Sequence, residues 1–215
     1  MLEAHQEKRP SLQKSGVLPG NTPVTRLTTN NGQLFAGTAG DGLWVREGSL
    51  WKQAGFKGQS IADVTFSPDG SQGFLAACNS ENLCSVYTNS DSGWIEITDG
   101  INNQLITDLL IAPDGESYAA GAGGIYRFEK TSGNWQTLLA TDASLTTISS
   151  SEDGNWLAAT GEGNAWYSLN RGENWQIVES LDQSLTYTSA LFTADGSLIL
   201  GSNTGGAYKL ELTKP

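Results

Sequence analysis

Short apolar runs separated by turn residues dominate this chain. In five of these runs, apolar and polar residues partly alternate, and each run precedes an Asn-Gly or Asp-Gly pair. Alternation is typical of a strand with one buried face, and Asn-Gly and Asp-Gly tolerate the positive φ of tight hairpin turns. The pattern therefore predicts five hairpins. Their first strands read VTRLT, IADVTF, ITDLLI, LTTISS and YTSALF, and their turns end at Gly32, Gly70, Gly115, Gly154 and Gly196.

Two further strands are predicted after each hairpin. The run after each turn ends in small residues, which allow neighbouring backbones to pack closely. A third strand carries an aromatic residue in four repeats, and a fourth strand begins at a tryptophan in four repeats. A repeat of about 40 residues with four strands is typical of a β-propeller blade. We therefore predict an all-β, five-bladed β-propeller with four-stranded antiparallel blades. The aromatic residues are Trp44, Tyr126, Trp166 and Tyr208, and the tryptophans are Trp51, Trp94, Trp135 and Trp175.

The fifth repeat lacks a fourth strand, because the chain stops at Pro215 soon after Tyr208. The segment SLQKSGVL, residues 11–18, aligns with SLWKQAGF of the first repeat. We expect this N-terminal strand to complete the last blade and close the ring, which protects the open sheet edge. Residues 1–10 would then be a polar tail and residues 11–215 a single domain. A fragment of a six- or seven-bladed ring is the alternative.

One turn motif resembles a known repeat. SLNRGENW, residues 168–175, is similar to the Asp-box pattern Ser-x-Asp-x-Gly-x-x-Trp, with Asn170 in place of the aspartate. SDSGW keeps Asp91, Gly93 and Trp94 of the pattern, and KTSGNW keeps Gly133 and Trp135. The chain thus resembles the BNR or Asp-box propeller superfamily, which includes sialidases, sortilin-like receptors and photosystem II assembly factors. The resemblance implies that the polar residue caps its own hairpin while the tryptophan packs between strands; an exposed tryptophan would instead offer a platform for a sugar.

Composition restricts the function classes. Twelve basic residues against 23 acidic ones give a net charge of -11, which argues against nucleic acid as a partner. No apolar run is long enough to span a bilayer. The single histidine, His5, lies in the polar tail, which excludes catalysis by a Ser-His or Cys-His pair and leaves too few ligands for a zinc site. We expect a soluble monomer without a cofactor.

The two cysteines, Cys78 and Cys84, allow two interpretations. They flank the short segment NSENL and could form a disulfide, or they could be free buried thiols. A disulfide would favour a periplasmic or secreted location.

One set of polar residues falls at the same position in every repeat, near the start of the innermost strand. Equivalent positions on innermost strands form a ring at the mouth of a propeller's central channel. In the first repeat, Arg26 takes this position only if the turn is one residue shorter than in the other repeats; otherwise Thr25 takes it. Asp63 and Asp108 could hold a cation or sugar hydroxyls with Arg26 beside them, or the ring could bind only water and backbone. The residues are Arg26, Asp63, Asp108, Thr147 and Ser189.

The connections around this predicted mouth are acidic and rich in Asn and Gln. We therefore predict a non-enzymatic binding or assembly scaffold that engages a partner protein through this face. A carbohydrate-binding propeller is the alternative, and a glycoside hydrolase that uses the channel-mouth carboxylates is less favoured. The acidic residues are Asp41, Glu81, Asp99, Asp142, Glu162 and Asp182.

Overall fold

The computed structural model describes residues 17–18, 21–101 and 104–212 of the chain. Within these residues the chain forms nineteen β-strands and no helix. This described part accordingly holds no helix with the length and apolar character needed to cross a membrane. The all-β class predicted from the alternating pattern is confirmed.

The strands form five antiparallel sheets in chain order, four with four strands and the last with three. Each four-stranded sheet runs from an innermost strand A through B and C to an outer strand D, and the fifth sheet ends at strand C. Strands A are β1 (Val24–Asn30), β5 (Ser60–Phe66), β9 (Ile106–Ile111), β13 (Leu145–Ser150) and β17 (Tyr187–Phe192). Strands B are β2 (Gln33–Thr38), β6 (Gly73–Cys78), β10 (Ser117–Gly121), β14 (Leu157–Gly161) and β18 (Ser197–Ser202). Strands C are β3 (Leu43–Glu47), β7 (Cys84–Ser90), β11 (Gly123–Glu129), β15 (Ala165–Ser168) and β19 (Ala207–Glu211). Strands D are β4 (Leu50–Gly55), β8 (Gly93–Glu96), β12 (Asn134–Thr141) and β16 (Gln176–Ile177).

The turn between strands A and B, called here the inner turn, carries the glycine that the sequence pattern identified. All five of these glycines have positive φ, between 71° at Gly70 and 85° at Gly115. In the second sheet, Asp69 Oδ1 accepts hydrogen bonds from Ser67 Oγ at 2.6 Å and from Ser71 N at 3.1 Å. The Ser67 hydroxyl and then Ser71 lower the pKa of Asp69 to about 2. The inner turn is therefore held by its side chains as well as by its glycine.

From the second sheet on, each sheet buries one face against the sheet before it. In the third sheet, Leu109 and Ala119 belong to the same buried cluster as Phe74 and Ala76 of the second sheet. Strand C adds an aromatic residue to the buried side of each sheet, because that residue pairs directly with a buried residue of strand B. The sequence pattern missed Tyr87, since the Gly-rich turn that precedes the other aromatic positions is replaced there by NSEN. The aromatic residues are Trp44, Tyr87, Tyr126, Trp166 and Tyr208.

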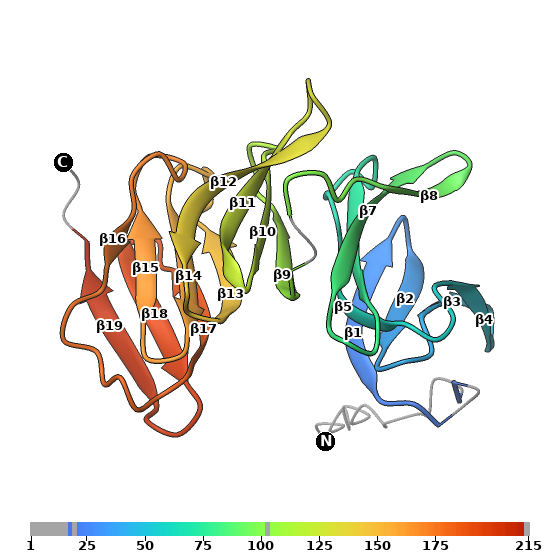
Figure 1. Ribbon diagram of the computed structural model, residues 1–215, viewed down its shortest axis with the longest axis horizontal. Coiled ribbons are helices and arrows are strands. Elements are labelled where there is room, and N and C mark those ends of the chain that lie inside the picture. Colours follow the sequence, from blue (N-terminus) through green and yellow to red (C-terminus); the bar gives the residue numbers. More distant parts are fainter. Residues whose placement is uncertain (1–16, 19–20, 102–103, 213–215) are drawn as a thin grey trace, which may run out of the picture.

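The innermost strands pack in chain order, β1 on β5, β5 on β9, β9 on β13 and β13 on β17. Among the described residues no packing of this extent joins β17 back to β1, and Figure 1 places their sheets at opposite ends of the long axis. Apolar side chains are exposed at these ends: Val24 by 44%, Leu27 by 63% and Leu191 by 53%. The residues equivalent to Leu27 in the second and third sheets are Val64 and Leu109. Their side chains are only 3% and 5% exposed. The part of the chain that the structure describes is therefore an array of sheets with two open ends.

The segment predicted to complete the fifth sheet lies largely outside the described residues. Val17 and Leu18 are described and belong to no strand, and the fifth sheet consists of β17, β18 and β19. The five repeats are thus present as five sheets, whereas closure of the ring by residues 11–18 stays a prediction. The polar tail, residues 1–10, also lies outside the described residues.

A disulfide joins the second and third strands of the second sheet. Cys78 and Cys84 pair directly in the register of β6 and β7, and their sulfur atoms are bonded. Their Cα atoms are 3.9 Å apart. The link fixes the connection between these strands at the end of the sheet where strand A begins.

Two truncations test the closure of the ring. We expect deletion of residues 1–19 to lower the melting temperature more than deletion of residues 1–8, because only the longer deletion removes the strand predicted to cover the open edge. Thermal unfolding followed by circular dichroism compares the two proteins. Equal melting temperatures would contradict closure by the N-terminal segment.

The disulfide gives a second prediction. Alkylation of the unfolded, non-reduced protein should modify neither Cys78 nor Cys84, as read by mass spectrometry. Reduction should lower the free energy of unfolding by about 2 kcal/mol, since the closed loop is short. Two alkylated thiols before reduction would show that the cysteines are free and would remove the argument for an oxidising compartment.

Candidate functional site

A β-bulge near the start of every strand A positions the predicted channel-mouth residues. In all five sheets the register between strands A and B shifts by one residue just before this position. A bulge leaves one residue unpaired and redirects the next side chain. The register places Arg26, rather than Thr25, at the equivalent position of the first sheet. The residues after the bulge are Arg26, Asp63, Asp108, Thr147 and Ser189.

Asp63 connects the first three sheets. Its Oδ1 accepts hydrogen bonds from Arg26 Nε at 2.9 Å and from the Val64 backbone N at 2.8 Å. Its Oδ2 accepts one from the backbone N of Leu109, on the third sheet, at 2.8 Å. The Asp63 side chain is only 8% exposed, whereas Arg26 is 42% exposed and also donates to the Thr107 carbonyl at 3.3 Å. Asp63 is therefore a buried carboxylate whose two oxygens both accept from protein donors.

Asp108 repeats this arrangement between the third and fourth sheets. Its Oδ2 accepts hydrogen bonds from Thr147 Oγ1 at 2.6 Å and from the Ile148 backbone N at 2.9 Å. Burial, and next the negative charge of Asp63, raise the pKa of Asp108 to about 7. Asp108 thus holds a proton over much of the range in which an ordinary aspartate is ionised. Arg26 and this proton together offset the repulsion between the two carboxyl groups.

The bulge residue itself supplies a second set of contacts between sheets. Thr25 Oγ1 donates to the Ile61 carbonyl of the next strand A at 2.7 Å. Thr107 and Thr146 donate in the same way to the next strand, at 2.8 and 2.5 Å. Sequence reasoning missed these threonines, although a threonine at the same offset in four of the five repeats was a usable signal. Ala62 stands at this position in the second sheet.

The structure brings four of the five predicted residues into one chain of contacts. Arg26 pairs with Asp63, and Thr147 donates to Asp108. Ser189 lies on β17, the last innermost strand, and is exposed. In the described ranges no group of three His, Cys, Asp or Glu side chains could hold a metal ion. The arrangement is suited to joining adjacent sheets, and a cation or sugar at this place would have to displace one of these internal contacts.

The loop face comprises the connections from strand D to the next strand A and those from strand B to strand C. These connections meet across neighbouring sheets, as in the bridges of Ala39 to Ser60 and of Glu162 to Thr186. Five of the six acidic residues of the loop face are exposed, Asp41 is half-buried, and none of them forms an ion pair within the described residues. Lys57 is an exposed cation on the same face. The loop face is therefore negatively charged and open to solvent.

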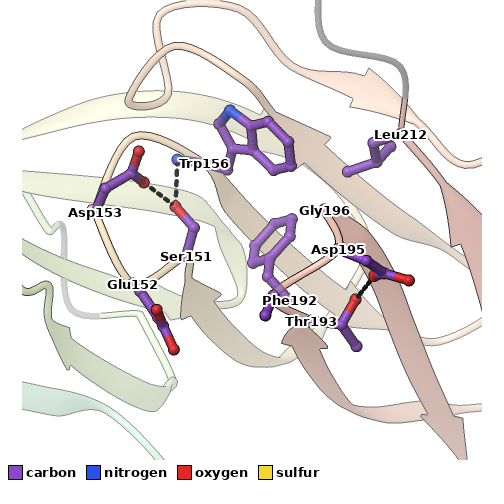
Figure 2. A pocket seen from close by; sticks show the side chains of 10 residues that line it. Ser151, Glu152, Asp153, Trp156, Phe192, Thr193, Asp195, Gly196 and Leu212 are labelled. Carbon is purple, nitrogen blue, oxygen red and sulfur yellow. Dashed lines mark hydrogen bonds between the residues drawn. The ribbon is translucent and has the colours of Figure 1, made fainter.

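A pocket that the sequence did not indicate lies at the opposite end of the sheets. The inner turns of the fourth and fifth sheets enclose a cavity of about 520 Å³, called here the turn pocket. Trp156 and Phe192 form an aromatic pair with ring centroids 5.9 Å apart, and Leu212 lies beside them (Figure 2). Glu152 and Asp153 lie on the side of the fourth sheet (Figure 2). The sequence pattern did not indicate this pocket, because Trp156 stands at the start of a run that reads as an ordinary strand.

The turn that resembles an Asp-box is closed by its own hydrogen bonds. Ser168 Oγ accepts from the Gly172 backbone N at 2.9 Å, and Asn170 Oδ1 accepts from the Asn174 backbone N at 3.0 Å. The polar residues therefore cap their own turn. All seven tryptophans lie within the described residues and none of them is fully exposed: Trp44, Trp51, Trp94, Trp135, Trp156, Trp166 and Trp175.

Comparison with known proteins supports the fold. No protein family model matches the chain, and no curated protein sequence matches it. Among solved structures it is similar to YCF48 bound to D1 peptide, with a TM-score of 0.64 at 16% identity over 92% of this chain and 67% of that one. It is also similar to an ancestral GH74 enzyme, with a TM-score of 0.71 at 18% identity over 92% of this chain and 32% of that one. The WD40 β-propeller domain of Doa1 gives 0.66 at 16% identity over 89% of this chain and 64% of that one. These similarities show a β-propeller fold, and the chain spans about one third to two thirds of these longer proteins.

Two single substitutions separate the roles of the carboxyl groups. Because the native state keeps the Asp108 proton that the unfolded chain loses above about pH 4, this residue's contribution to stability should fall as pH rises from about 4 to about 7. Asp108→Asn mimics the protonated group, so it should remove this decline and melt no lower than wild type at pH 8. Asp63→Asn should lower stability by roughly 2 kcal/mol at every pH, because its amide group cannot accept from all three donors.

Thermal melts of both variants and wild type between pH 5 and pH 8 check this prediction. Equal destabilisation by the two substitutions at pH 8 would contradict it, because the amide at position 108 would then fail to replace the carboxyl group. A melting temperature of wild type that rises with millimolar calcium, and no longer does so in the variants, would instead identify a cation site.

Proposed function

We propose that this chain is a non-enzymatic scaffold whose five sheets are propeller blades and whose loop face binds a partner protein. The observation that carries the proposal is the exposed, unpaired negative charge on the loop face, to which four of the five sheets contribute. Such a surface complements a basic partner and accelerates encounter with it. The similarity to YCF48 in complex with a peptide supports a fold that can serve protein recognition.

The inner strands argue against a hydrolase. Asp63 already accepts from three protein donors, and Asp108 accepts from two. A glycosidase needs one carboxyl group as acid and another free to act as base or nucleophile on the substrate. Here the two groups are engaged with backbone and side chains of adjacent sheets. They support the scaffold, and we assign no catalytic residue.

Carbohydrate binding is less well supported than protein binding. A sugar platform needs an exposed aromatic face. None of the tryptophans is fully exposed, and Trp135 is 4% exposed with its Nε1 bonded to the Ile97 carbonyl at 2.7 Å. The tryptophans that the Asp-box resemblance highlighted thus pack within and between sheets.

Charge reversal on the loop face tests the proposal. Asp99 and Asp142 lie in the connections before β9 and β13, are exposed and have no ionic partner in the described part. Partner capture from an extract of the source cells by wild-type protein should be lost with Asp99→Lys combined with Asp142→Lys. The matched control, Asp91→Lys with Glu173→Lys, places the same charge change in two turns between strands C and D and should retain capture.

Quantitative mass spectrometry of the captured proteins gives the readout. The proposal predicts a protein that is recovered with wild type and control and depleted with the loop-face variant. Recovery of the same proteins with both variants would show that the loop face is not the interface. The protein could also be tested against a panel of glycosides. Hydrolysis of any of them that is abolished by Asp108→Asn would show that the protein is an enzyme and would contradict the scaffold proposal.

A further inference from the structure

Four of the five inner turns share one structure, and the first inner turn differs from them. In the four turns that carry Asp-Gly, the glycine N–H donates to the carbonyl three residues before it, at 2.8 to 3.0 Å. The aspartate Oδ1 accepts from the backbone N two residues further on, at 3.1 or 3.2 Å. Both groups of the Asp-Gly pair are therefore engaged within the turn. The aspartates are Asp69, Asp114, Asp153 and Asp195.

The first inner turn is a two-residue connection, because Asn30 pairs with Gln33 across it. Its residues Asn31 and Gly32 are exposed and form the single Asn-Gly pair of the sequence. Both have positive φ, 49° and 77°, as in a type I′ hairpin turn. Within the part of the chain that the structure describes, no hydrogen bond engages the Asn31 carboxamide or the Gly32 N–H. This turn therefore leaves both groups open to reaction with each other.

Asparagine is a thermolabile residue because its side chain reacts with the backbone. The N of the next residue, once it has lost its proton, attacks Cγ of the asparagine, and the N–Cγ bond forms as ammonia leaves. Water then opens the five-membered imide at either carbonyl group, which gives aspartate or isoaspartate. Glycine as the next residue has no side chain to hinder the attack. A hydrogen bond donated by its N–H opposes the loss of the proton.

We propose that Asn31 is a site of spontaneous deamidation in the folded protein, whereas the four Asp-Gly turns are protected from imide formation. An aspartate forms the same imide only when its carboxyl group is protonated, because water must then leave. The Ser67 hydroxyl and then Ser71 lower the pKa of Asp69 to about 2, so this carboxyl group is ionised at neutral pH. The reaction takes place at the end of the sheets opposite the loop face and does not depend on the partner proposed above.

The product places a new negative charge beside the inner turn of the second sheet. A methyl group on Gly70 would lie 2.7 Å from both Nδ2 and Oδ1 of Asn31, so the Asn31 side chain lies directly against that turn. Asp69 precedes Gly70 and is exposed. A carboxylate at position 31 therefore repels Asp69 across the junction of the first two sheets. Isoaspartate also adds one carbon atom to the backbone of the turn, which disturbs the hairpin of β1 and β2.

Mass spectrometry of the incubated protein tests the modification. Folded protein is kept at pH 6 or pH 8 and digested with trypsin, and aspartate and isoaspartate are distinguished by electron-transfer fragmentation. The peptide of residues 27–46 should exchange ammonia for water at Asn31, faster at pH 8 because the Gly32 N must lose its proton. Protein digested without incubation is the control. An unchanged Asn31, under conditions that convert a synthetic peptide of residues 27–46, would overturn the proposal.

The unfolded chain tests the protection of the other turns. In urea at pH 6 their hydrogen bonds are lost, so isoaspartate should form at Asp69 and Asp153 faster than it does in the folded protein. Equal rates in the folded and the unfolded protein would show that the inner turns do not protect these aspartates and would overturn that part of the proposal.

Two variants test the consequence for the hairpin. Asn31→Asp carries the charge of the product, whereas Asn31→Gly keeps the position neutral, tolerates the positive φ and cannot lose ammonia. Asn31→Asp should speed the exchange of the β1 and β2 amide hydrogens about threefold relative to fresh wild type, as expected for one exposed pair of charges, and added salt should reduce this effect. Asn31→Gly should keep its mass on incubation. Equal exchange in the two variants would show that the new charge does not disturb the junction.

Discussion

The β-bulge on strand A is the constraint on which the rest of this structure depends. In the second and third sheets the bulge turns an aspartate toward the next sheet, where a backbone N–H would otherwise be buried without an acceptor. Asp63 and Asp108 accept from these N–H groups, and the unpaired threonines donate to the opposing carbonyls. Successive sheets are therefore held in register by hydrogen bonds in the middle, while apolar faces fill the space farther out. Both features are needed, since apolar contact alone is non-directional and would allow the sheets to slide.

Most of the fold could be predicted from local sequence patterns. The Asn-Gly and Asp-Gly pairs that end at Gly32 and Gly70 mark turns with a positive φ that few other residues adopt. The hairpins and their number could therefore be predicted from the sequence. The position of Arg26 and Asp63 was also readable, because the repeat length fixes equivalence. Their partners were not, since a hydrogen bond from Leu109 N to a carboxylate of another sheet depends on how the sheets pack. Tyr87 was missed because its local turn differs from the others.

The turn pocket illustrates the same limit. Trp156 and Phe192 belong to different repeats, and nothing in either repeat alone indicates that their rings meet. Closure of the array could not be read either. Equivalence of residues 11–18 to an outer strand is an argument from alignment, whereas closure depends on the rotation from each sheet to the next. Five sheets close only if each turns by about one fifth of a circle, and in this structure the first and last sheets lie at opposite ends of the long axis (Figure 1).

The linear packing of the described sheets also determines how the molecule unfolds. Among the described residues each inner sheet packs on two neighbours, whereas the sheets of β1 and β17 pack on one each, and Leu27 and Leu191 are exposed on their outer faces. In a linear array of repeats, stability is approximately a sum of nearest-neighbour terms. Amide hydrogens should therefore exchange with solvent fastest in the two terminal sheets and slowest in the third, which contributes Asp108. Such a gradient makes the terminal repeats tolerant of sequence change, while a substitution in the middle is transmitted to both halves.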